Sequence, residues 1–134
     1  MANETILVAE DDAVQREGLA VLLREEGYTV FTAVDGQEAL HSLGNDPTPD
    51  LILLDMLMPV HDGWRFLKER TWSPRLASIP VVIVTSLGNA SLEWAASLGA
   101  AGFLRKPFDV EPLLTEIRRC CRMARSGGPQ LVSG

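Results

Sequence analysis

The sequence predicts an α/β fold in which five parallel strands form one open, doubly wound sheet with helices on both faces. Short apolar runs alternate with helical patterns along the chain, which is the order of repeated βα units. The runs at 51–54 and 80–86 are continuously apolar, as is typical of strands buried on both faces of a parallel sheet. The expected strands lie at 5–9, 28–34, 51–54, 80–86 and 102–106. The second strand alternates more than the others, so we expect it at an edge.

Five helices are expected, one after each strand. Asp12 and Asp35 each stand before a helical pattern and are followed three residues later by Gln15 and Glu38, which is the spacing of a capping box at a helix start. Asp62 stands in the same way before the third helix. We therefore interpret Asp12 as a helix cap rather than as a metal ligand.

Apolar stripes predict which side of the last two helices faces the sheet, because residues three and four positions apart share one helix face. In the last helix the stripe consists of Val110, Leu113, Leu114, Ile117, Cys121 and Ala124. In the fourth helix the expected inward stripe consists of Leu92, Ala95, Ala96 and Gly99. Trp94 lies off this second stripe, so we expect it to be exposed.

Composition narrows the class of protein. A chain of 134 residues, with 46% hydrophobic and 22% charged residues, has the size and balance of one folded domain. A formal net charge of -6 argues against nucleic acid and anionic membranes as direct partners. No apolar run reaches the roughly 18 residues of a membrane span, and the first residues do not have the pattern of a signal peptide, so the cytoplasm is the expected compartment.

Cysteine and histidine give no sign of a disulfide framework or of a metal site. Cys120 and Cys121 are adjacent, and a bridge between neighbours would be strained, so both are expected to be small core residues. His41 and His61 stand alone without ligand spacing and are expected on the surface or in a loop.

Polar residues mark the carboxyl ends of the strands, which all meet at one edge of a parallel sheet. The first strand leads into Glu10 and Asp11, the third ends at Asp55, the fourth at Thr85 and the fifth at Lys106. Carboxylates at close quarters repel one another unless a cation is present, and an all-oxygen site suits Mg²⁺. A hydroxyl and an ammonium beside Asp55 fit the neutralisation of a phosphoryl group, which makes Asp55 the candidate nucleophile.

Four segments carry a resemblance to a known family. Taken in order, "ILVAEDD" (6–12), "DLILLDMLMPVHDG" (50–63), "IPVVIVTS" (79–86) and "LGAAGFLRKPF" (98–108) resemble the receiver domain of bacterial response regulators. The resemblance implies a flavodoxin-like sheet with strand order 2-1-3-4-5. It also implies a receiver domain over 1–125. The residues after it, 126–134, are rich in Gly and Ser, so we expect a flexible tail or linker there.

The resemblance implies a role for each residue of the predicted site. Asp55 would accept a phosphoryl group from a phosphohistidine on a sensor histidine kinase or a histidine phosphotransfer protein. Asp11 would bind Mg²⁺ directly and Glu10 directly or through water, while Asp55 and the backbone carbonyl of Leu57 would complete the protein ligands. Lys106 would pair with one phosphoryl oxygen.

Further residues would form the switch. Thr85 would hydrogen-bond a phosphoryl oxygen after phosphorylation, and Phe103 occupies the position of an aromatic residue that turns inward in response. The bond between Lys106 and Pro107 is expected to be cis, as in the family. The output face of relatives consists of the fourth helix, the fifth strand and the fifth helix, and we expect Trp94 to contact a protein partner there.

The resulting interpretation is a phosphorylation-switched signalling module, monomeric or dimerising on phosphorylation, that acts alone or within a longer regulator. It is not expected to be an enzyme beyond its own phosphoryl transfer and slow autodephosphorylation. Leu57 and Leu87 flank the site with apolar side chains, which predicts slow attack by water. One alternative is a receiver-like interaction domain that acts without phosphorylation. Another is a phosphohydrolase, which would commonly carry a second Asp where this chain has Leu57.

Overall fold

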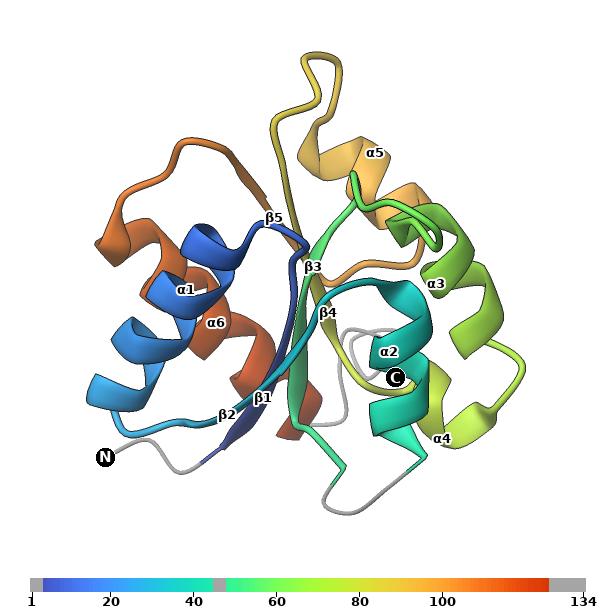
Figure 1. Cartoon of the computed structure of the whole chain (residues 1–134), viewed down its shortest axis with the longest axis horizontal. Helices are drawn as coiled ribbons and strands as arrows, with labels where there is room; N and C mark the ends of the chain where they lie inside the picture. The colour runs from blue at the N-terminus through green and yellow to red at the C-terminus, as the bar shows by residue number, and fades with distance from the viewer. Residues whose placement is uncertain (1–3, 45–47, 126–134) are drawn as a thin grey trace.

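The computed structural model describes residues 4–44 and 48–125 and shows one five-stranded sheet between two layers of helices (Figure 1). The strands are β1 (Thr5–Ala9), β2 (Thr29–Ala33), β3 (Leu51–Asp55), β4 (Val81–Thr85) and β5 (Gly102–Arg105). They are parallel and lie in the order β2-β1-β3-β4-β5, which confirms the predicted sheet and places β2 at an edge. The tail predicted at 126–134 lies outside the described residues.

Helices cover both faces of the sheet. They are α1 (Ala13–Glu25), α2 (Gly36–Leu43), α3 (Gly63–Arg70), α4 (Pro74–Ala77), α5 (Leu92–Ser97) and α6 (Val110–Arg125). α1 and α6 lie on one face, and α2, α3, α4 and α5 lie on the other (Figure 1). Across residues 4–44 and 48–125, no helix combines the length and the apolar character that crossing a membrane requires.

Two apolar clusters, one on each face of the sheet, form the core. Side chains alternate between the faces along a strand, so Leu51 and Leu53 of β3 pack with α1 and α6, while Ile52 and Leu54 pack with α2 and α3. Every residue of β3 and β4 is buried. This double burial is the physical reason for the continuous apolar runs in the sequence.

Three aspartates begin helices as predicted. The Oδ1 atoms of Asp12, Asp35 and Asp62 each accept a hydrogen bond at 2.9 Å from the backbone N–H three residues later. An Ncap side chain of this kind satisfies one of the backbone donors that a helix leaves free at its start. These caps fix where α1, α2 and α3 leave the strand ends.

The structure departs from the predicted helices in two places. The short helix α4 was not predicted, because its four residues are too few to show a helical period, although Pro74 stands at its first turn. In α5 only Ala95 of the expected stripe is buried, whereas Leu92 is 57% exposed and Ala96 and Gly99 are also exposed. Trp94 is half-buried and packs against the core, so its expected exposure is only partial.

The last helix largely follows its predicted stripe. Leu113, Leu114, Ile117 and Cys121 are buried as expected, and Cys120 is buried with them. Neither cysteine forms a disulfide, and both lie on the buried side of α6 in the core cluster, which confirms their structural interpretation. The two ends of the stripe, Val110 and Ala124, are exposed.

The two histidines differ. His41 is exposed on α2, as predicted. His61 lies in the loop before α3, in agreement with the expected surface or loop position, but it is buried there, at 3% exposed. Its carbonyl oxygen accepts a hydrogen bond from Gly36 N at 2.9 Å, and its Nε2 lies 3.4 Å from Glu69 Oε1 without hydrogen-bond alignment. The start of α2 therefore packs directly on this loop.

We expect Gly63→Ala to destabilise the fold, because a Cβ at this position would lie 2.6 Å from Met56 Sδ, 2.7 Å from Met56 Cα and 3.1 Å from Asp55 O. Such overpacking costs about 1–3 kcal/mol in the free energy of unfolding. The matched control is Gly18→Ala in α1, where the new Cβ would meet no heavy atom within 4 Å apart from its chain neighbours and the nearby backbone of its own helix, and the better helix propensity should add about 0.5–1 kcal/mol. Urea denaturation measures the free energy of unfolding of both variants. Changes of the same sign in the two variants would contradict the close approach of α3 to β3.

Candidate functional site

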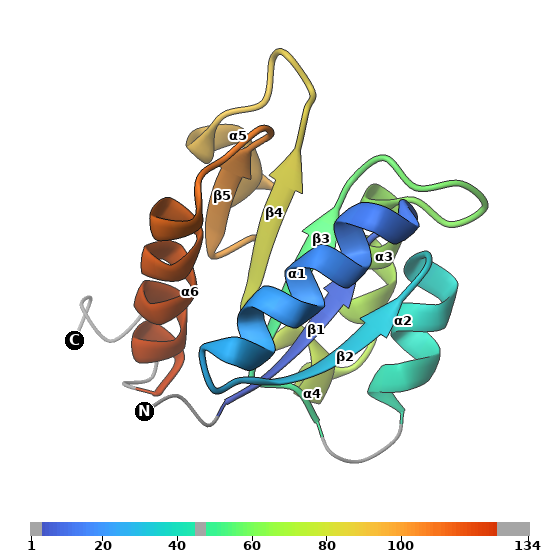
Figure 2. The ribbon, with the colours of Figure 1, turned by 60° about the vertical axis from the view of Figure 1, so that its left-hand side comes forward.

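The parallel sheet brings the predicted site residues to one edge. All five strands point the same way (Figure 2). Ala9 pairs with Leu54 across β1 and β3, so extending this register by one residue places Glu10 beside Asp55. Asp55 pairs with Val84 on β4, and the next residue of β4, Thr85, ends that strand. The sequence prediction that these strand ends converge is therefore confirmed.

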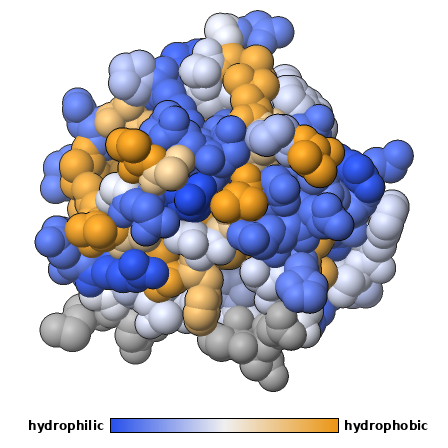
Figure 3. Space-filling view, viewed as in Figure 1, coloured by the Kyte–Doolittle hydropathy of each residue, from blue (hydrophilic) through white to orange (hydrophobic). Residues whose placement is uncertain are grey.

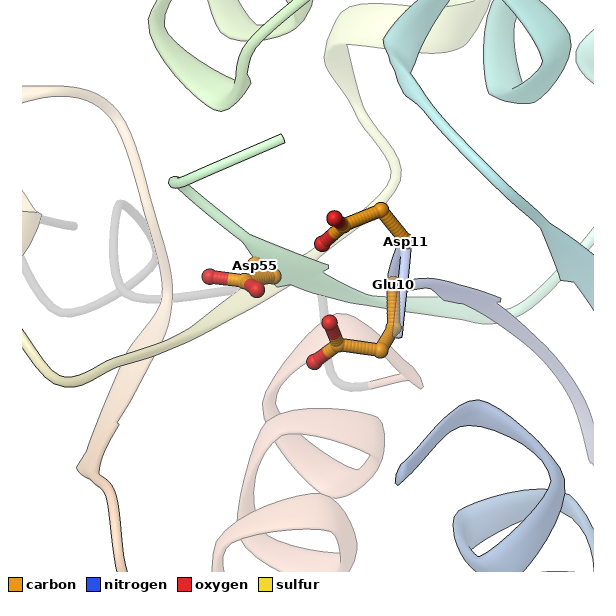
Figure 4. Close-up of side chains that lie close together, drawn as sticks. All are labelled: Glu10, Asp11 and Asp55. Atoms are coloured by element: carbon orange, nitrogen blue, oxygen red, sulfur yellow. The ribbon is translucent and has the colours of Figure 1, made fainter. Parts of the chain in front are cut away.

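Three carboxylates form the centre of this edge. Oxygens of Glu10, Asp11 and Asp55 all lie within 4.8 Å of one another, and Figure 4 shows the three side chains turned toward a common space. Glu10 is 1% exposed and Asp55 is 5% exposed, whereas Asp11 is open to solvent. Two of the three negative charges are thus held away from bulk water, where their mutual repulsion is weakly screened.

Lys106 supplies the nearest positive charge. Its Nζ donates to Glu10 Oε1 at 2.6 Å, to Gln15 Oε1 at 2.7 Å and to Asp55 Oδ2 at 3.3 Å. These three acceptors match the three donors of an ammonium group. The other oxygen of Asp55, Oδ1, accepts a hydrogen bond from Leu57 N at 3.1 Å. The ammonium therefore joins the end of β5 to the ends of β1 and β3.

The pKa values of the site follow from burial and from this pairing. Burial raises the pKa of Glu10 above its ordinary 4.5, although the hydrogen bond from Lys106 opposes the shift. Asp11 is open to solvent, but partial desolvation at the site and the adjacent Glu10 raise the pKa of its carboxyl above 3.8. Burial alone would lower the pKa of Lys106, but the hydrogen bond to Glu10 and the charges of Asp55 and Glu10 raise it above 10.5.

These directions set how the site affects stability. A carboxyl with a raised pKa in the folded state holds its proton more tightly there than in the unfolded chain. The contributions of Glu10 and Asp11 to stability therefore fall as the pH rises through their raised pKa values. The contribution of Lys106 is present below 10.5 and is lost as the pH rises through its raised pKa. When they are ionised, the three carboxylates repel one another, and a bound cation would reduce this repulsion.

The carboxylate cluster fits a small, hard divalent cation. All three side chains offer oxygen, which Mg²⁺ prefers, and their oxygens lie close enough together to share one ion. Asp12 does not belong to the cluster, since its side chain caps α1 as predicted. Its backbone N–H donates to Glu10 Oε2 at 3.1 Å and so helps to orient that carboxylate.

Sequence reasoning missed two contributions from the first turns of α1. Gln15 was assigned only to the helix cap, yet its side chain contacts Lys106. Arg16 was not singled out, and its Nη1 donates to the carbonyl oxygens of Glu10 at 3.0 Å and Asp11 at 3.2 Å. The sequence did carry one signal for both residues, which is their position in the chain. A helix that starts at the end of a strand places the residues of its first turns over that strand end.

Thr85 and the loop after it border the site on the β4 side. Thr85 is fully buried, and its Oγ1 accepts a hydrogen bond from Leu87 N at 3.3 Å. Arg105, the last residue of β5, donates to the carbonyl oxygens of Leu87 and Ala90. The bond between Lys106 and Pro107 is cis, as predicted. The hydroxyl is therefore at the predicted edge, and an arginine holds the loop that follows it.

Phe103 and Trp94 form part of a row of aromatic rings. The Phe103 ring lies edge-on to Trp94, with centroids 6.5 Å apart, and Trp94 lies edge-on to Trp64 at 6.1 Å. The guanidinium of Arg105 stands 5.7 Å from the centroid of the Phe103 ring. Phe103 is half-buried.

On the face seen in Figure 3, apolar side chains form several separate patches among hydrophilic ones.

Comparison with known proteins gives close sequence relatives. A model of the response regulator receiver domain matches residues 6–118. The transcriptional regulatory protein PdtaR of Mycobacterium tuberculosis is 41% identical over 114 residues, which cover 84% of this chain and 54% of that protein. The phosphate regulon transcriptional regulatory protein PhoB of Escherichia coli is 35% identical over 118 residues, covering 87% of this chain and 51% of that protein. The chain thus spans about half the length of these relatives.

Solved structures show the same fold. A putative response regulator from Chloroflexus aurantiacus superposes with a TM-score of 0.82 at 30% identity, covering 90% of this chain and 99% of that one. The chemotaxis response regulator CheY4 of Vibrio cholerae superposes with a TM-score of 0.79 at 31% identity, covering 89% of this chain and 99% of that one. Fold and sequence agree. The chain therefore belongs to the family of response regulator receiver domains of two-component systems.

Proposed function

We propose that this chain is a phosphorylation-switched receiver in which Asp55 accepts the phosphoryl group. The single observation that carries the proposal is the position of Asp55, a buried carboxylate at a strand end between an acidic pair and the ammonium of Lys106. A carboxylate is an established acceptor that forms an acyl phosphate. The phosphoryl donor is a phosphohistidine of a sensor histidine kinase or of a histidine phosphotransfer protein.

The transfer exchanges one bond for another. An oxygen of Asp55 forms the new P–O bond, the P–N bond of the phosphohistidine breaks, and the imidazole leaves with the electron pair and takes up a proton. Little covalent chemistry is left for other groups, so the site acts by positioning and by neutralising charge on the phosphoryl oxygens. Lys106 is placed to pair with one of these oxygens. The hydroxyl of Thr85 is the proposed donor to another.

Mg²⁺ is the proposed cofactor. Glu10, Asp11 and Asp55 would hold it with the backbone carbonyl of Leu57, and the raised pKa values of the first two support this assignment. When bound, the ion neutralises negative charge on the carboxylates and on the incoming phosphoryl group. Arg16 keeps Glu10 and Asp11 in place through their carbonyl oxygens.

The output is proposed to be a protein contact on the face formed by α5, β5 and α6. PdtaR and PhoB are named as transcriptional regulatory proteins, and both extend beyond the matched region. We infer that this receiver acts in the cytoplasm, alone or within a longer regulator, as a monomer or a phosphorylation-dependent dimer. With a net charge of -6 the domain is not expected to bind nucleic acid itself. Trp94 remains a proposed partner contact, through the part of its ring that packing leaves accessible.

Two other functions are disfavoured by specific residues. An interaction domain that works without phosphorylation has no need for Asp11, Asp55, Thr85 and Lys106 together at one edge. A phosphohydrolase would need a general acid near the acceptor, whereas Leu57 stands two residues after Asp55. The receiver is accordingly treated as a switch and not as a turnover enzyme.

Incubation with Mg²⁺ and a small acyl phosphate should add one phosphoryl group to the protein, as measured by intact mass. Asp55→Asn should abolish the adduct, because an amide is a far weaker nucleophile. Asp62→Asn is the matched control in the same loop, since Asn caps a helix as well as Asp does, and it should be phosphorylated normally. No adduct on the wild type would favour the interaction domain. Free phosphate released over many turnovers would favour the hydrolase.

Mg²⁺ should raise the melting temperature, and Asp11→Asn should remove most of this rise. Removing one of three crowded negative charges should also make the metal-free protein slightly more stable, because the pKa of Asp11 is raised. A ligand at a hundred times its Kd stabilises by about 2.7 kcal/mol. Asp12→Asn is the matched control, because it keeps the helix cap and leaves the cluster intact. An equal Mg²⁺ response of the two variants would refute the assignment of Asp11.

The aspartyl phosphate should be long-lived, because neither Leu57 nor Leu87 can hydrogen-bond an attacking water. Leu57 is 45% exposed, so Leu57→Asn should be tolerated and should shorten the phosphoryl lifetime. One hydrogen bond that orients water in the transition state, worth about 1 kcal/mol, corresponds to a roughly fivefold faster loss. Leu57→Met is the apolar control. Loss of the wild-type phosphoryl group within seconds at neutral pH, followed by intact mass, would overturn the prediction.

A further inference from the structure

Gln15 contacts the ammonium that faces the phosphoryl acceptor. Its Oε1 accepts a hydrogen bond from Lys106 Nζ at 2.7 Å, which is shorter than the 3.3 Å between Nζ and Asp55 Oδ2. The remaining short contact of Nζ is with Glu10 Oε1 at 2.6 Å. The two closest partners of the ammonium are therefore side chains on the β1 and α1 side of the site.

The geometry of an ammonium group gives these contacts a directional effect. Its three N–H donors diverge at fixed angles, so two short hydrogen bonds determine where the third points. The lysine stem itself is long and flexible and does not fix the direction. We propose that Gln15 is a positioning residue that, together with Glu10, aims the third N–H of Lys106 at Asp55. This inference rests on the proposed role of Asp55 as phosphoryl acceptor.

Gln15 is itself well placed by the start of α1. Its backbone N–H donates to Asp12 Oδ1 at 2.9 Å, so the helix cap fixes the residue before its side chain reaches across to Lys106. The side chain of Lys106 is 17% exposed, and its contact with Gln15 is exposed, whereas the side chain of Glu10 is only 2% exposed. Gln15 therefore supplies a protein acceptor to an ammonium that water could otherwise reach.

Gln15 and Glu10 both contact Lys106, but they differ in the other groups that their side chains contact. The carboxylate of Glu10 is shared between Lys106, the backbone of Asp12 and the carboxylate cluster that fits a cation. The amide oxygen of Gln15 is neutral and is not part of that cluster. It can hold Lys106 whether or not Glu10 is engaged by a cation. Gln15 thus keeps the ammonium oriented when Glu10 binds another group.

The test compares Gln15→Met, which keeps the length of the side chain but removes the acceptor, with Gln15→Glu, which keeps an acceptor oxygen. Gln37→Met, at an exposed glutamine in the first turn of α2, is the matched control. One readout is the rate of phosphorylation by a small acyl phosphate at saturating Mg²⁺. The other is the NMR order parameter of the Lys106 ammonium in the metal-free protein, which does not depend on phosphorylation.

We expect Gln15→Met to slow phosphorylation roughly three- to tenfold, in line with the loss of one charge-assisted hydrogen bond at a partly exposed site, and to lower the order parameter of Lys106. Gln15→Glu should keep the ammonium ordered, and Gln37→Met should match the wild type in both readouts. A slower rate without a change in ammonium order, or a change in order without a slower rate, would overturn the positioning role. Wild-type behaviour of Gln15→Met would overturn it as well. If the wild type itself forms no adduct, the proposed function fails first, and the inference falls with it.

Discussion

Repulsion among three carboxylates within 4.8 Å of one another is the constraint on which the rest of the site depends. Two of them are buried, and Lys106 supplies one opposing charge. The start of α1 adds further compensation, because a helix N-terminus carries partial positive charge. Arg16 adds a full charge and holds the carbonyl oxygens behind the cluster. The fold thus tolerates this negative edge without neutralising it, which leaves room for a cation and a phosphoryl group to complete the balance.

The parallel sheet is what makes such an edge possible. In a parallel sheet the carboxyl ends of all strands lie together, and from the end of each strand the chain continues into a loop and a helix. β1 and β3 are neighbours, so their next residues, Glu10 and Asp55, come side by side although they are far apart in the sequence. The buried residues of β3 fix the position of Asp55 at the end of the strand, while Gly63 lets α3 begin close against Met56. Stability and site geometry therefore depend on the same residues.

The sequence predicted the strands, three helix caps and the convergence of Glu10, Asp55 and Lys106, because each follows from local pattern and from the rule that parallel strands end together. It did not predict contacts that depend on side-chain reach. Gln15 meets Lys106 across the site, and His61 is buried because the start of α2 packs on its loop. Neither the contact of Gln15 nor the burial of His61 produces a periodic pattern in the sequence. In α5 the stripe failed since six residues are too few to define a face, and large rings set the packing instead.

Phe103 and Thr85 are linked through Arg105 even though they lie on different strands. The guanidinium stands near the Phe103 ring and also holds two carbonyl oxygens of the loop that follows Thr85. If that loop shifted, the guanidinium that it binds would move with it, and the Phe103 ring would lose or gain a cationic neighbour. Phe103 has no hydroxyl, so alternative positions of its ring would differ in packing, in solvation and in this contact with Arg105, and not through a hydrogen bond. Trp94 and Trp64 supply that packing, which means that any turn of Phe103 must be accommodated by α5 and α3 together.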